Sequence, residues 1–135
     1  MSEPEKIVRA FLQLWAAGDL DKALQYVADD AVYALYISRE VLPVGGETKG
    51  KEDIRAALRF VREQFDYVLF RPGNWITSGD TVRLRVEHMY LHRRSGEMLT
   101  GTFRIVFRVQ GRLIVRADEY HDRAMVESFM RLFGA

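Results

Sequence analysis

Two hydrophobic periodicities divide the chain, with helical spacing first and strand alternation after it. Apolar residues at i, i+4, i+7 and i+8 predict the buried stripe of a first helix, at Ile7, Phe11, Leu14 and Trp15. Ser2 followed by Glu5 has the pattern of a capping box, and Gly18 predicts the end of this helix. Asp19 can cap a second helix, whose inner side is predicted at Leu20, Ala23, Leu24 and Val27.

The middle of the chain predicts a strand, a long loop and a third helix. Asp29 and Asp30 interrupt the second helix, and residues 31–37 have the aromatic and β-branched composition of a strand. Residues 38–50 combine one proline and three glycines with polar residues, which predicts a loop at the rim of a pocket. A third helix is predicted for residues 51–65, because its apolar residues share one face.

From residue 67 the pattern becomes that of hairpin-linked strands. Strands are predicted at residues 67–70 with a continuation at 74–77, and at 81–92, 97–109 and 113–121. Asp122 has the position of an N-cap for a last helix. Helices followed by paired strands indicate an α+β fold. We therefore expect three N-terminal helices over a curved antiparallel sheet, with a small-molecule pocket between them.

Composition narrows the possible functions. The 135 residues suit one domain spanning 1–135, and 48% of them are apolar, enough for a core. A net charge of +1 gives no basic field, so no nucleic-acid partner is expected. The absence of cysteine excludes disulfides and thiol chemistry. The acidic start and the lack of any apolar run near the roughly 20 residues of a membrane span predict a cytoplasmic protein with no membrane partner.

Strand alternation assigns the faces of the sheet. In residues 97–109 one face is apolar and must pack under the helices, at Phe103, Ile105, Phe107 and Val109. Residues 81–92 alternate between two mixed sets. The first set is Val82, Leu84, Val86, His88 and Tyr90, and the second is Arg83, Arg85, Glu87, Met89 and Leu91. Taken alone, this pattern favours the first set toward the core and the second on a solvated charged face.

The densest polar stretch of any predicted strand is residues 118–122. Glu119 is a candidate acid–base if it points into a pocket roofed by Trp15 and Phe11, and the alternative is a salt bridge to an arginine. His121 shares its face and could relay protons or orient a neighbour. Tyr33 and Tyr36 lie on opposite faces, so only one can donate a hydrogen bond inside the pocket. Glu119 and His121 lack a third ligand, so neither a metal nor a cofactor is expected.

Five segments in this order resemble the SnoaL-like branch of the nuclear transport factor 2-like superfamily. They are residues 11–19 (ending WAAGD), 28–33 (ADDAVY), 49–54 (KGKEDI), 111–116 (GRLIVR) and 119–122 (EYHD). The superfamily includes ketosteroid isomerases, polyketide cyclases and limonene epoxide hydrolase. The resemblance implies a cone-shaped domain, a pocket between helices and concave sheet, and a homodimer through the outer face of the sheet.

Individual functional residues carry over unevenly. The epoxide hydrolases use an Arg-x-Asp and a last-strand Asp, which Arg85, Glu87 and Glu119 resemble, and this similarity favours Arg85 and Glu87 pointing inward. Tyr33 fits the tyrosine that holds the hydrolytic water, but Leu35 stands where those enzymes have an asparagine. The isomerases' first-strand base has no counterpart, because residues 34–36 contain no carboxylate.

The resemblance and the residues together predict a cofactor-free lyase, isomerase or hydrolase acting on a small, largely apolar, oxygenated substrate. The predicted catalytic residues are Glu119, Glu87, Arg85, Tyr33 and His121, and the predicted ligand-binding residues are Trp15, Phe11, Leu35, Phe103, Ile105 and Met89. The alternative is a non-catalytic domain that binds a small apolar ligand or a partner's segment in the same pocket.

Overall fold

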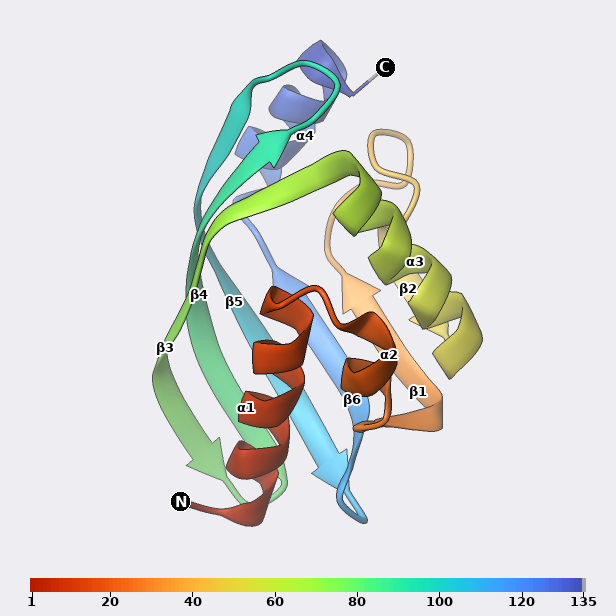
Figure 1. Ribbon diagram of the computed structural model, residues 1–135, viewed down its shortest axis with the longest axis vertical. Coiled ribbons are helices and arrows are strands. Elements are labelled where there is room, and N and C mark those ends of the chain that lie inside the picture. The colour runs from red at the N-terminus through yellow and green to blue at the C-terminus, as the bar shows by residue number, and fades with distance from the viewer. Residues whose placement is uncertain (135) are drawn as a thin grey trace.

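The computed structural model describes residues 1–134; Ala135, the last residue of the predicted domain, lies outside them. Figure 1 shows helices packed against one face of a curved sheet. The elements in chain order are α1 (Glu3–Ala16), α2 (Leu20–Leu24), β1 (Val27–Leu35), β2 (Gly46–Lys49), α3 (Lys51–Gln64), β3 (Phe65–Ser78), β4 (Thr81–His92), β5 (Met98–Gln110), β6 (Leu113–Tyr120) and α4 (Arg123–Phe133). This architecture confirms the α+β prediction.

The sheet has six strands in the order β2-β1-β6-β5-β4-β3. Neighbouring strands are antiparallel except β1 and β6, which run parallel. In Figure 1, α1 and α2 lie across the face of the sheet, α3 lies beside β1, and α4 lies at the end opposite the N-terminus. The helices therefore close the concave face, and the core lies between the two layers.

The predicted helix caps are present at three helix starts. The Ser2 hydroxyl accepts a hydrogen bond from the amide of Glu5 at α1, and the Asp19 carboxylate accepts one from Lys22 at α2. Asp122 accepts one from the amide of Met125, which confirms it as the N-cap of α4. Each cap satisfies an amide that the helix itself leaves without a partner.

Three regions differ from the predictions. Phe65, predicted as the end of the third helix, begins β3, which continues to Ser78 without the predicted break at Pro72 and Gly73. The second helix ends at Leu24, and β1 begins at Val27, which pairs with Ile114. The pairing register shifts between Val27 and Val32, so the exposed Asp29 and Asp30 remain within the strand. The segment predicted as loop 38–50 contains β2, which pairs with β1 from Val32↔Lys49 to Leu35↔Gly46. Four polar and glycine residues carry too little alternation to predict a strand.

The orientation of β4 corrects the expectation drawn from the epoxide hydrolases. Its buried positions are Val82, Leu84, Val86, His88 and Tyr90, whereas Arg85 and Glu87 are exposed on the outer face and Met89 is half-buried there. A shift of one residue would flip every side chain, burying charges under the helices and exposing the apolar set. The prediction that Arg85, Glu87 and Met89 line the pocket is therefore wrong.

Candidate functional site

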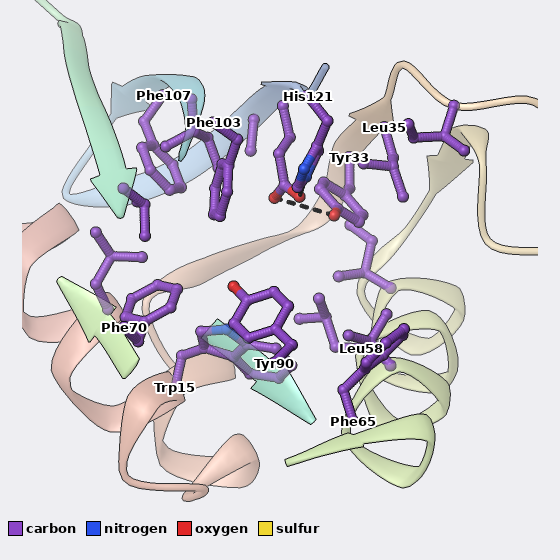
Figure 2. Close-up of a pocket in the computed structure, with 18 of the residues that line it drawn as sticks. Trp15, Tyr33, Leu35, Leu58, Phe65, Phe70, Tyr90, Phe103, Phe107 and His121 are labelled. Carbon is purple, nitrogen blue, oxygen red and sulfur yellow. Dashed lines mark hydrogen bonds and ion pairs between the residues drawn. The ribbon is translucent and has the colours of Figure 1, made fainter. Parts of the chain in front are cut away.

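A cavity of about 110 Å³ lies between the helices and the concave face of the sheet. Most of the side chains around it are apolar or aromatic, and they come from all layers of the fold. Figure 2 shows Trp15, Tyr90, Leu58 and Phe65 on one wall, opposite Tyr33, Phe103 and His121. An aromatic lining of this kind excludes water and suits a small organic molecule.

The polar centre of the cavity is the carboxylate of Glu119. Its Oε1 accepts a hydrogen bond of 3.1 Å from the Tyr33 hydroxyl, and its Oε2 lies 2.6 Å from Nε2 of His121. The side chain of Glu119 is 17% exposed and that of His121 is 9% exposed. In Figure 2 a dashed line marks the hydrogen bond that the Tyr33 hydroxyl donates to Glu119, and His121 lies next to it. The carboxylate is thus fixed by two neighbours and still faces the cavity.

The strand register explains why these residues meet. The parallel pairing of β1 with β6 places Leu35 beside Glu119 and Tyr33 beside Ala117, so Tyr33 and Glu119 share the concave face. His121 follows the last residue of β6 and precedes Asp122, the cap of α4. The ring of Phe103 stacks on His121 with 4.4 Å between centroids. His121 is therefore held between a sheet end, a helix start and an aromatic ring.

Three tyrosines around the cavity are protonated at neutral pH. Burial raises the pKa of Tyr33 well above its ordinary value, and the nearby negative charge of Glu119 raises it further. Burial, followed by the charge of Glu119, also raises the pKa of Tyr67. Burial is again the largest cause that raises the pKa of Tyr90. The Tyr67 and Tyr90 rings stack at 4.0 Å, and the hydroxyls of both keep their protons, whereas the Tyr33 hydroxyl already donates to Glu119.

His88 is a buried histidine beside this cluster that the sequence reasoning did not assign to the site. It is 0% exposed, and neither ring nitrogen has a hydrogen-bond partner among residues 1–134. Burial, helped by the proximity of His121, lowers the pKa of His88 to about 4. The alternation of residues 81–92 predicts that His88 points inward. That alternation contains no information about which residue of another strand lies beside it, so it did not indicate His121.

The structure brings together most of the predicted site. Glu119, Tyr33 and His121 form the polar centre, and the cavity is lined by the predicted Trp15, Phe11, Leu35, Phe103 and Ile105. Glu87 instead pairs with Arg71 at 3.0 Å on the outer face. Arg85 lies there directly opposite Arg104. Tyr67 and Tyr90 were missed because core aromatics and pocket aromatics follow the same alternation.

Two classes of feature are absent from the described part of the chain. Residues 1–134 contain no group of three histidine, cysteine or acidic side chains placed to hold a metal ion. No helix in this part is long and apolar enough to cross a membrane.

Fold and site together define an α+β domain with helices over a curved sheet and a cavity between the two layers. The family model described as SnoaL-like domain matches residues 8–117, so the chain belongs to the SnoaL-like family. Comparison with curated proteins gives no match.

Three solved structures show the same fold at low sequence identity. A nuclear transport factor 2-like protein of unknown function from Burkholderia pseudomallei is 22% identical, with all of both chains covered and a TM-score of 0.85. TerC, co-crystallised with polyporic acid, is 16% identical over 96% of this chain and 99% of its own, with a TM-score of 0.82. A protein with a ketosteroid isomerase-like fold from Catenulispora acidiphila, in complex with trimethylamine, is 16% identical over 85% and 84%, with a TM-score of 0.72.

Proposed function

We propose that this protein is a cofactor-free acid–base enzyme for a small, largely apolar, oxygenated substrate, with Glu119 as the acid–base. One observation carries the proposal: a single carboxylate, held by Tyr33 and His121, faces an otherwise apolar cavity. A positioned carboxylate in such surroundings can take a proton from a weakly acidic carbon, because little water competes for it.

The remaining polar groups suit the charge that this step creates. When Glu119 takes a proton from a carbon beside a carbonyl, the electron pair moves to the carbonyl oxygen. A tyrosine O–H from Tyr67 or Tyr90 can donate to that oxygen. Glu119 then returns the proton to another carbon, which completes an isomerisation. In a cyclisation, the enolate carbon instead attacks a second carbonyl of the same molecule, the C=O π bond breaks, and the resulting alkoxide takes the proton back from Glu119. His121 keeps the carboxylate in place throughout.

The outward position of Arg85 and Glu87 narrows the choice among reaction types. An epoxide-hydrolase mechanism of the predicted kind needs two carboxylates bridged by an arginine around one water. Only Glu119 of the three proposed groups reaches the cavity. The geometry therefore favours isomerase or cyclase chemistry over hydrolysis. The complexes of TerC with polyporic acid and of the Catenulispora protein with trimethylamine support a small organic ligand.

A second candidate is a non-catalytic binding domain, and one specific observation favours it. Both oxygens of Glu119 already have neighbours within the protein, which leaves the apolar wall as the main binding surface. A ligand held only by that wall would be retained unchanged.

Substrate screening with two matched variants separates these candidates. Small ketones, enones and polyketide-like phenols are tested for binding by thermal shift and for conversion by mass spectrometry. For any substrate converted, we expect Glu119→Gln to lower turnover by about 10²–10⁴-fold. Glu87→Gln, the same change on the outer face, should leave turnover unchanged. Equal turnover in Glu119→Gln and wild type would refute the acid–base role, and binding without conversion would favour the second candidate.

The proposal includes a homodimer formed through the outer face of the sheet. Apolar side chains at Met89, Leu91, Met98 and Val106 lie there beside arginines. Arg85 directly faces Arg104, a like-charge arrangement that disfavours an isolated surface. A second copy related by two-fold symmetry covers the apolar residues and brings its own acidic side chains to this face.

A further inference from the structure

His88 occupies a position that its own contacts do not explain. Its imidazole is fully buried, yet both ring nitrogens lack partners among the described residues. A buried polar group without a hydrogen-bond partner destabilises the fold. A phenylalanine or leucine would fill the same space without that cost, so packing alone does not account for a histidine here.

The nearest polar group with the same deficit is His121. Its Nε2 is engaged with Glu119, but its Nδ1 is buried and has no partner within residues 1–134. The rings of His88 and His121 are 5.9 Å apart at their centroids and nearly perpendicular. Both rings flank Phe103, at 5.4 Å and 4.4 Å. A centroid separation of this size is in the range that one bridging water can span between two ring nitrogens.

The strand between them is open at the relevant position. Gly101 of β5 pairs with His88, and a Cβ at Gly101 would lie 3.6 Å from Nε2 of His88. Because Gly101 has no side chain, no β5 side chain stands at this position between His88 and the neighbouring β6, which ends beside His121. Met125 of α4 closes this space from the other side, 3.0 Å from the same Cβ position.

A neutral imidazole is well suited to partner another histidine. It carries one N–H donor and one lone pair, and it can exchange which nitrogen holds the proton. When Nε2 of His121 is protonated and donates to Glu119, Nδ1 is left with a lone pair, and neutral His88 can donate its N–H to that atom. The pKa of about 4 keeps His88 neutral across the physiological range.

We infer that His88 is a positioning residue that partners Nδ1 of His121 and thereby keeps Nε2 directed at Glu119. The inference rests on the proposed role of Glu119, which His88 does not touch. It extends the site by one layer, from Glu119 through His121 to His88. The titratable groups that face His88 are His121, Glu119 and Tyr90. Glu119 is the only one of the three that carries a negative charge, and it contacts His121 rather than His88.

Nitrogen-15 NMR of histidine side chains tests this directly, because the chain contains only three histidines. In the ligand-free wild type we expect His121 to show a single tautomer, protonated at Nε2, with Nδ1 shifted by an accepted hydrogen bond. His88→Phe keeps a stacked ring and removes the partner, so both His121 nitrogens should move to values of a tautomer mixture. His88→Gln, whose amide can donate and accept, should restore the wild-type preference.

His92→Phe is the matched control, since His92 is equally buried on the same face of β4 but contacts Ser95. It should leave the His121 signals unchanged. The inference is overturned if His88→Phe retains the wild-type tautomer, or if His92→Phe has the same effect. Should His88→Phe not fold, a mixture of His121 tautomers in the wild type overturns it equally. No substrate is added, so a negative result concerns His88 alone, whereas the proposed function fails on the turnover of Glu119→Gln.

Discussion

Glu119 lines the cavity and His88 lies beside its partner His121, and their surroundings act on them in opposite ways. Glu119 has a donor on each oxygen, from Tyr33 and His121. Neither ring nitrogen of His88 makes a hydrogen bond within residues 1–134, and burial favours the neutral form of the ring. Each difference has a measurable consequence for stability.

Acid should destabilise the fold through His88. Its pKa is about 4 when folded and 6.5 when exposed, so the unfolded chain binds the proton first as pH falls. The folding contribution is intact above pH 6.5 and is lost progressively down to pH 4. The loss is about 3 kcal/mol between pH 7 and pH 4. Urea unfolding at both pH values measures it.

His88→Phe supplies the comparison for this titration. The variant lacks the ionisable ring, so its stability should fall less over the same pH range, with the remaining fall due to groups such as His92, whose pKa is also lowered by burial. Parallel pH profiles for the two proteins would contradict the buried, neutral state of His88.

The hydrogen bond from Tyr33 should contribute to stability as well as to the site. Tyr33→Phe keeps the ring and removes the O–H that reaches Glu119, and we expect a loss of about 1–3 kcal/mol in the free energy of unfolding. Tyr36→Phe is the control, because the Tyr36 hydroxyl donates to Asp118 at 2.9 Å on the exposed face. Its loss should be smaller, since water replaces an exposed hydrogen bond. Equal losses would mean that the Glu119 contact is no stronger than a surface contact.

At the scale of elements, α4 is joined to the segment between β1 and β2. The carboxylate of Glu127 accepts a hydrogen bond of 2.9 Å from the amide of Ser38. Arg123 and Arg131 flank it, and the hydrogen bond from Arg123 is the main reason that the pKa of Glu127 is lowered. Leu42 of the segment and Val126 of α4 line the cavity. The hydrogen bond between Ser38 and Glu127 therefore fixes the distance between these two elements at one end of the cavity.

Removing the hydrogen bond between Ser38 and Glu127 should increase local opening of the segment between β1 and β2 without unfolding the domain. Glu127→Ala should accelerate hydrogen exchange at the Ser38 amide, whereas Glu40→Ala, an exposed change in the same segment, should not. Because the pKa of Glu127 is lowered, the protection is present above about pH 4.5 and disappears as pH falls through the folded value. Unchanged exchange at Ser38 in Glu127→Ala would show that other contacts hold the segment.

The elements also show what the sequence can and cannot predict. Strand β4 was predicted at its observed bounds, because twelve alternating residues between two turns give a clear signal. The alternation at Val82, Leu84 and Val86 correctly predicted the inward face. The similarity to the epoxide hydrolases favoured the opposite orientation for Arg85 and Glu87, and that prediction was wrong. The contact of Tyr33 with Glu119 depends on the parallel pairing of β1 with β6, and hydrophobic periodicity contains no information about which strands pair.

For the whole molecule, the proposed homodimer through the outer face of the sheet predicts the oligomeric state. Light scattering of the purified protein should give twice the chain mass of 15.7 kDa, that is 2 × 15.7 = 31.4 kDa. Val106→Glu, at the centre of this face, should yield monomers. Leu132→Glu, on the 74% exposed Leu132 of α4, should remain dimeric. A wild-type mass of 15.7 kDa would contradict the proposed dimer.

The hydrogen bond between Tyr33 and Glu119 joins residues 86 positions apart in the chain. Such a contact cannot form early in folding, because the loop it closes must first be ordered by the sheet. During synthesis, helix α1 and strand β1 leave the ribosome long before their partners on β6 exist. A partly synthesised chain that lacks β6 therefore cannot form the contact between Tyr33 and Glu119. Any activity that depends on this contact would show that β6 has paired with β1.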